Sequence, residues 1–186
     1  MRIACTVVLV TLVAVLGAGA MSPALAQTPG TAAPAPEAIV GAARDLMQAV
    51  RYCAVVSVDA AGQPQARTMD VFPPDENMVV WFATNPKSRK VDQIRKNPRV
   101  TVHCYDAHAP ELGYVSIQGR ARLVTDPAEK QRRWKEGWEV HWPNRDEGYL
   151  LVVITPERLE MFSPKHGILA DAVTWQPAGT NLGVKK

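Results

Sequence analysis

The stretch from Tyr114 to Thr125 alternates between apolar and polar side chains, with Val115, Ile117, Gly119, Ala121 and Leu123 on one side. A period of two over this length is typical of a long β-strand with one buried face. Shorter segments of strand-forming composition recur along the chain, at 53–58, 64–71, 78–84, 99–105, 148–155 and 158–162. Turn residues or short connections separate most of them, which favours antiparallel pairing.

Three segments have the pattern of helices instead. Apolar residues recur every three or four positions between 37 and 50, a second helix is expected from Ser88 to the Asn97-Pro98 stop, and a third from Asp126-Pro127 to about Trp138. Few helices among many short strands predict an α+β fold. We expect a mainly antiparallel, six-stranded barrel with flanking helices.

The first 26 residues differ from the rest and are read as a signal peptide. Arg2 precedes an almost unbroken apolar run from Ile3 to Leu16, and Ala24-Leu25-Ala26 supplies small residues for cleavage before Gln27. An uncleaved membrane anchor is the alternative, although a span needs about 20 apolar residues. We expect a disordered linker at 27–36, the folded domain at 37–165 and a C-terminal tail at 166–186. A Sec-type signal predicts a periplasmic or secreted protein without a stable membrane span after cleavage.

Charge and cysteine content narrow the function classes of the mature chain. The formal net charge of +3 falls to +2 without Arg2, and basic residues alternate with acidic ones, which argues against nucleic acid as a partner. Cys53 and Cys104 remain after cleavage. They form either one disulfide, permitted in an oxidising compartment, or two buried free thiols.

Ser88, Arg89 and Lys90 stand at the expected start of the second helix. The Ser88 hydroxyl can cap the helix, and two cations beside the free amides of a first turn favour a bound anion. Each cation is unfavourably placed against the helix dipole, by up to about 1 kcal/mol, unless a negative group lies beside it. The alternative is that both side chains extend into water. Arg67 on the 64–71 strand supports the anion site, because it can converge with this corner.

Several motifs occur in an order that resembles the pyridoxamine 5′-phosphate oxidase-like superfamily of flavin-binding split β-barrels. They are the hairpin with Arg67, the Trp81-Phe82-Ala83-Thr84 strand, Ser88-Arg89-Lys90, Asn97-Pro98-Arg99-Val100, and the strand with Gly119. The segments from Trp142-Pro143 to Gly148-Tyr149, and Thr155-Pro156-Glu157-Arg158, are similar to the general-stress-protein branch.

The resemblance implies a flavin mononucleotide (FMN) site and a homodimer with the cofactor between subunits. Arg67, Arg89 and Lys90 would hold the flavin phosphate with Ser88 and Thr84 as neighbours, and the backbone at Thr68, Met69 and Ala83 would line the ring system. Related barrels also bind the deazaflavin F420 or haem. An oxidoreductase acting on an unknown small molecule is the leading expectation, and a non-catalytic stress or binding protein is the alternative.

The chain also departs from the vitamin-oxidising members of that superfamily. Tyr114 stands where they carry a glutamine, and their closing motif with arginine and histidine is missing, so pyridoxal phosphate synthesis is not expected. The four histidines lack metal-ligand spacing, and no metal site is predicted. Trp134, Trp138 and Trp142 recur every four residues, as a helix face packed on the barrel or as an aromatic wall beside a flavin. No catalytic side chain is assigned.

Overall fold

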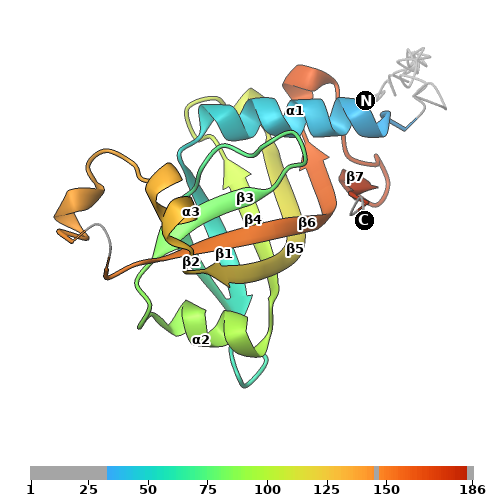
Figure 1. Cartoon of the computed structure of the whole chain (residues 1–186). Helices are drawn as coiled ribbons and strands as arrows, with labels where there is room; N and C mark the ends of the chain where they lie inside the picture. The colour runs from blue at the N-terminus through green and yellow to red at the C-terminus, as the bar shows by residue number, and fades with distance from the viewer. Residues whose placement is uncertain (1–32, 145–146, 184–186) are drawn as a thin grey trace, which may run out of the picture. The chain divides into compact units, whose positions relative to one another are not determined.

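One antiparallel sheet forms the framework of a computed structural model that describes residues 33–144 and 147–183 (Figure 1). The strand order is β2-β1-β4-β5-β6-β3, with β7 added to β6. The strands are β1 (Tyr52–Val58), β2 (Pro64–Asp70), β3 (Val80–Thr84), β4 (Arg99–Tyr105), β5 (Tyr114–Val124), β6 (Leu150–Phe162) and β7 (Ala178–Asn181). The expected antiparallel split barrel is thus confirmed, whereas the predicted signal peptide and most of the predicted linker lie outside the described residues.

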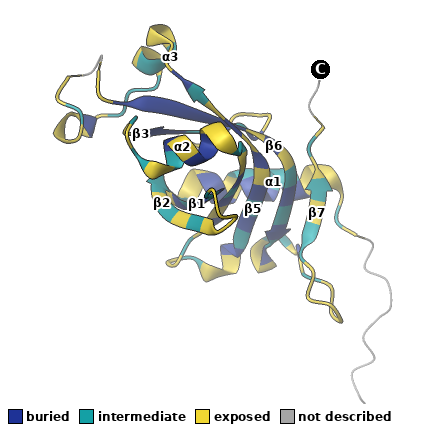
Figure 2. Ribbon diagram, turned by 90° about the horizontal axis from the view of Figure 1, so that it is seen from below, coloured by how far each residue is buried: buried dark blue, intermediate teal, exposed yellow. Residues whose placement is uncertain are grey.

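Three α-helices flank the sheet: α1 (Pro36–Ala49), α2 (Arg89–Lys96) and α3 (Pro127–Arg132). The apolar stripe of α1 is buried against the sheet through Ile39, Ala43, Leu46 and Met47, each at most 2% exposed. Figure 2 shows the resulting pattern, with buried residues along the inner faces of the strands and exposed ones on the outer sides of the helices. Among the described residues, no helix is long and apolar enough to cross a membrane.

The last long strand differs from the expectation of two separate strands. β6 runs without a break from Leu150 to Phe162, and its register with β5 shifts at Gln118 and Gly119. At this bulge a side chain on residue 119 would lie 2.4 Å from the Thr155 carbonyl oxygen, so only glycine allows the close approach. The bulge lets one strand pair with β5 along its whole length and still continue past Pro156, which no alternation pattern indicates.

A disulfide joins β1 to β4. Ala54 lies opposite His103 in this pair, so Cys53 and Cys104 face each other across the two strands, and both side chains are buried. The sequence left open a disulfide or two buried free thiols, and the structure contains the disulfide.

The described part of the C-terminal segment contacts the barrel. β7 pairs with β6 from Arg158 to Met161, and Ile168 is buried in the main core. The His166 ring connects the Ser163 hydroxyl, 2.8 Å from Nδ1, to Asp45 on α1, 3.3 Å from Nε2. No sequence pattern predicted this extra strand.

Candidate functional site

The two end strands of the sheet, β2 and β3, face each other where the barrel is split. Among the described residues, only an isolated bridge between Val71 and Phe82 joins this side, with the Phe72 amide donating to the Trp81 carbonyl at 2.8 Å. Beside the bridge lies a cleft of about 630 Å³. Because β2 has a partner on one side only, its other edge presents backbone N–H and C=O groups to a ligand.

Arg67 is held at one side of this split by two buried polar residues. Its guanidinium donates to the Ser57 hydroxyl at 2.6 Å and to the Gln93 side-chain oxygen of α2 at 3.2 Å, and Ser57 donates to the same oxygen at 2.6 Å. Ser57 lies on the inward side of β1, where its neighbours Cys53 and Val55 are apolar. This triad fixes the arginine between β2 and α2 without neutralising its charge.

Lys90 comes from the first turn of α2 and reaches back to the end of β3. Its ammonium donates to the Thr84 hydroxyl at 2.9 Å, and Thr84 lies 3.2 Å from the Ser88 hydroxyl. Ser88 is the residue before the helix, but its side chain makes no capping hydrogen bond. The prediction that the Ser88 hydroxyl caps α2 is therefore wrong, because that hydroxyl turns towards Thr84 instead.

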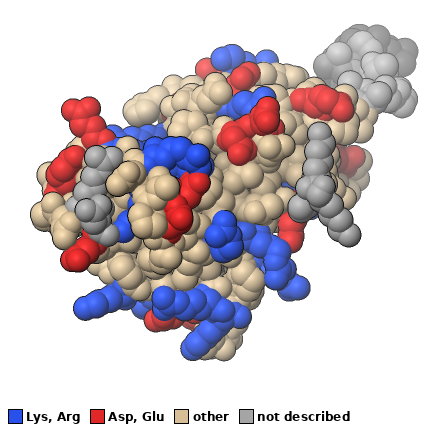
Figure 3. All heavy atoms as spheres, viewed as in Figure 1, with Lys and Arg blue, Asp and Glu red and all other residues tan. Residues whose placement is uncertain are grey.

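The corner carries positive charge that no neighbouring carboxylate neutralises. Burial and the charge of Arg89 lower the pKa of Arg67, and burial and the charge of Arg67 lower the pKa of Lys90. Within the described ranges, no carboxylate lies at ion-pair distance from any of these three cations, and Asp59 feels Arg89 only at longer range. Lys and Arg side chains gather over the lower end of the view where α2 lies (Figure 3). Such a cluster favours an anion with several oxygen atoms.

The opposite side of the cleft is a wall of aromatic residues from 134 to 142. Trp138 packs edge-to-face against Trp134 and Trp142, at ring-centre distances of 5.7 and 5.3 Å, and all three rings contact Tyr149. The predicted helix to Trp138 is wrong in extent, because α3 ends at Arg132 and only a short 3₁₀ turn, Trp138–Val140, follows. The three tryptophans still share one surface, and Trp138 and Trp142 line the cleft.

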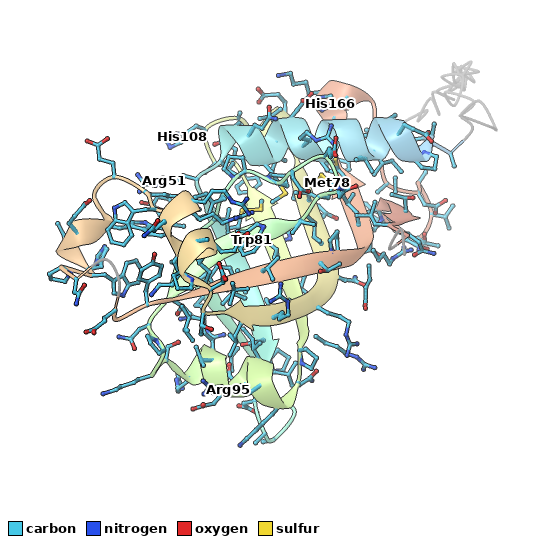
Figure 4. All side chains as sticks on the ribbon, in the orientation of Figure 1. Arg51, Met78, Trp81, Arg95, His108 and His166 are labelled. Carbon is cyan, nitrogen blue, oxygen red and sulfur yellow. A yellow bond between two sulfur atoms is a disulfide. The ribbon has the colours of Figure 1, made fainter. Side chains whose placement is uncertain are left out.

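Cationic side chains fasten this wall to the barrel. The Lys135 ammonium binds the Asp70 carboxylate and donates to the Val71 carbonyl at 2.7 Å, and it lies 4.4 Å from the centre of the Phe72 ring. The Arg133 guanidinium stacks 3.6 Å from the centre of the Trp81 ring, on the barrel beside α3 (Figure 4). Asp70 also accepts from Arg51 at 2.8 Å. These contacts attach the wall to β2 and β3 at the side of the cleft.

The structure brings the predicted site residues to one region. Thr68, Met69, Ala83, Thr84 and Lys90 line the cleft, while Arg67 and Ser88 adjoin it through the contacts described above. Arg89 is exposed beside them, close enough for its charge to lower the pKa of Arg67. Asp70, Trp138 and Trp142 line the cleft as well, and the two tryptophans do so in line with the second alternative given for them, an aromatic wall. Sequence reasoning did not place in the site the remaining lining residues, which are Arg51, Tyr52, Asn85, Glu136, Gly137 and His141. It also missed Ser57 and Gln93. Ser57 had a usable signal, since a polar residue at an inward strand position needs a buried partner.

Comparison with known proteins identifies the fold family. A family model described as pyridoxamine 5′-phosphate oxidase matches residues 39–163, which is more than half of the chain. The chain belongs to the pyridoxamine 5′-phosphate oxidase family. General stress protein 26 of Bacillus subtilis (strain 168) is 24% identical to it over 104 residues, which are 55% of this chain and 73% of that protein.

Solved structures of this family have the same fold. A protein of Clostridium acetobutylicum related to general stress protein 26 aligns with a TM-score of 0.66 at 18% identity, over 80% of this chain and 97% of that one. An FMN-binding protein of Nostoc punctiforme aligns with a TM-score of 0.53 at 16% identity, over 82% and 98%. The predicted resemblance, including the general-stress-protein branch, is confirmed.

Proposed function

We propose that this family member binds FMN and acts as an oxidoreductase on a small molecule. The observation that carries the proposal is the cluster of Arg67, Arg89 and Lys90, whose charges no carboxylate of the described residues neutralises, beside the open edge of β2. A dianionic phosphate fits this cluster because it accepts several charge-assisted hydrogen bonds at once. The FMN-binding relative from Nostoc punctiforme supports the choice of ligand.

In this proposal the chain holds the two ends of the cofactor differently. Arg67, Arg89 and Lys90 bind the phosphate, with Ser88 and Thr84 as hydrogen-bonding neighbours, and Thr68, Met69 and Ala83 line the ring system. A bound flavin supplies hydride or electron transfer, while the polypeptide orients it and excludes water. The fixed triad of Arg67, Ser57 and Gln93 prepares the phosphate end, since its guanidinium needs no reordering on binding.

Export of the protein to the periplasm or beyond is part of the same proposal. The Cys53–Cys104 disulfide supports it, because buried disulfides persist in oxidising compartments and are rare in reducing ones. In this view the chain folds after translocation and acquires its flavin there.

We also propose a homodimer that completes the cofactor site. Tyr52 and Tyr105 are 55% and 50% exposed on the outward sides of β1 and β4, and Tyr114 stacks between His103 and Phe162 on the same outer surface. Apolar and aromatic side chains without a covering element favour burial against a second subunit. Tyr52 also lines the cleft, so a partner seated on this surface would adjoin the cofactor.

Purified mature protein tests the proposal directly. A flavin absorption spectrum, or a rise in melting temperature on addition of FMN that saturates, is the expected result. A protein that shows neither would refute it. A deazaflavin or haem spectrum would mean that the same fold binds that cofactor instead of FMN. If alanine at both Arg89 and Lys90 changes neither ligand binding nor stability, the corner serves no ligand, which favours the alternative of a non-catalytic stress or binding protein.

A further inference from the structure

The cleft is charged differently at its two ends. The end formed by β3 and α2 has Lys90, with Arg67 and Arg89 nearby, as described above. The outer end is lined by Glu136, Gly137, Trp138, His141 and Trp142 from the wall, and by Arg51, Tyr52 and Asp70 from the barrel. In Figure 3 acidic side chains gather over the left part of the view, where the wall lies in Figure 1.

The charges of the outer end are not equally available to a ligand. Arg51 donates through Nε and Nη2 to Asp70, at 3.1 and 2.8 Å, so its guanidinium is held in an ion pair. Asp70 in turn also binds Lys135. Glu136 is exposed, and among the described residues no cation lies within ion-pair distance of it. Asp70 is thus shared by Arg51 and Lys135, and among the described residues Glu136 is the charged group of this lining that no ion pair engages.

The aromatic groups at the same end offer flat surfaces. Trp142 is partly exposed and packs edge-to-face on Trp138, which is nearly buried. The faces of Trp and Tyr rings carry negative electrostatic potential and attract both planar rings and cations. An anionic substrate would meet the Glu136 carboxylate here, and the ring faces would not attract it.

We propose that the outer end of the cleft binds a flat aromatic substrate that is uncharged or cationic, with Glu136 as the residue that selects against anions. This inference rests on the proposed function, because it assumes that the basic end is reserved for the cofactor phosphate. It adds that a substrate carrying its own phosphate is disfavoured at the outer end.

Three probes with the same ring and different charge test the proposal: 1-methylnicotinamide, nicotinamide and nicotinate. Each is titrated into FMN-loaded and flavin-free mature protein, and binding is followed by calorimetry. An exposed carboxylate contributes about 0.2–1 kcal/mol for attraction and a similar amount for repulsion, so the cation should bind about two- to thirtyfold more tightly than the anion. Nicotinamide should lie between them.

Variants assign the selectivity to residues. Glu136→Gln should bring the ratio of cation to anion affinity close to one, whereas Glu111→Gln, an exposed residue that does not line the cleft, should leave it unchanged. Trp142→Leu should weaken all three probes, and the cation most, because the ring face attracts both planar rings and cations. Nicotinate binding as tightly as the cation, an unchanged ratio in Glu136→Gln, or no saturable binding of any probe overturns the proposal.

A parallel FMN titration separates the two proposals. If FMN does not bind but flavin-free protein keeps the order of the three probes, the cofactor proposal fails and the selectivity stands. If FMN binds and the probes show no charge order, the selectivity alone fails.

Discussion

Replacing Lys90 by methionine should weaken cofactor binding while leaving the unliganded protein as stable as before, or more stable. Methionine keeps a similar length and apolar stem but removes the ammonium. In the unliganded protein this ammonium is half-buried, lies at the start of α2 and is repelled by Arg67, and burial and that repulsion lower its pKa. Thr84, which loses the lysine, keeps its contact with Ser88 at 3.2 Å.

The two expected effects have opposite signs. A hydrogen bond to a charged group contributes about 1.5–3 kcal/mol, so loss of the Lys90 contact should raise the Kd for FMN about 10- to 150-fold. Removal of a cation at a helix start should stabilise the unliganded fold by up to about 1 kcal/mol, a rise in Tm of up to about 4 °C for a chain of this size. Flavin fluorescence measures the first effect, and thermal unfolding monitored by circular dichroism measures the second.

Lys96→Met is the matched control, since Lys96 is exposed in the last turn of the same helix. There the charge agrees with the helix dipole, so its loss should slightly lower Tm and leave FMN binding unchanged. If Lys90→Met lowers the stability of unliganded protein and leaves the Kd for FMN unchanged, Lys90 is a structural partner of Thr84 and the reasoning about the corner is wrong.

Three further predictions concern the framework of the site. Replacing Cys53 and Cys104 together by alanine should lower the free energy of unfolding by about 2–4 kcal/mol, measured by urea denaturation, because the bond closes a loop of 51 residues. Partial burial raises the pKa of Asp70, but hydrogen bonds from Arg51 and Lys135 outweigh it and lower this pKa. The stabilising contribution of Asp70 is therefore complete above the unfolded pKa of about 4 and is lost as the pH falls through the lower folded pKa. Asp70→Asn should therefore destabilise the protein by about 1–3 kcal/mol at pH 7 and by much less at pH 2, and equal losses at both pH values would contradict this. Trp138→Ala should cost about 3–5 kcal/mol, as a nearly buried ring at the centre of the wall, whereas exposed Trp175→Ala should change the stability by less than about 0.5 kcal/mol.

The sequence predicted those parts of the fold that depend on local periodicity. The alternation from Tyr114 to Thr125 became β5, the stripe from Ile39 to Met47 became the buried side of α1, and the turn at Asp59 joined the β1–β2 hairpin. The sequence did not predict those strands whose extent depends on a tertiary contact. Continuity of β6 past Pro156 depends on the bulge at Gly119, and β7 forms because β6 offers an unpaired edge beyond β3.

For the site, too, the sequence indicated what depends on local pattern and missed what depends on distant contacts. Arg89 and Lys90 could be grouped because cations at a helix start are unfavourable without an anion, and Arg67 could be added because its strand can converge with that corner. For the tryptophans the sequence left open a helix face or an aromatic wall. The continuous helix is wrong, since Trp134 follows α3 and Trp138 lies in a separate 3₁₀ turn. What positions them is the bond from Lys135 to Asp70, which joins residues 65 positions apart and leaves no local pattern.

Folding and cofactor binding are physically separable in this chain. The main core is built from α1 and the inward faces of the strands and contains neither Arg67, Arg89 nor Lys90. The three cations sit at the rim, where their mutual repulsion costs little compared with the apolar burial of the core. The disulfide adds stability that does not depend on a ligand. Under the proposed function, a chain built in this way folds without a flavin and binds it afterwards, which the proposed export in an unfolded state requires. In Lys90→Met, a given concentration of FMN should therefore raise the Tm by less than in the unchanged protein, because FMN binds more weakly. Folding of the unliganded variant should not be impaired.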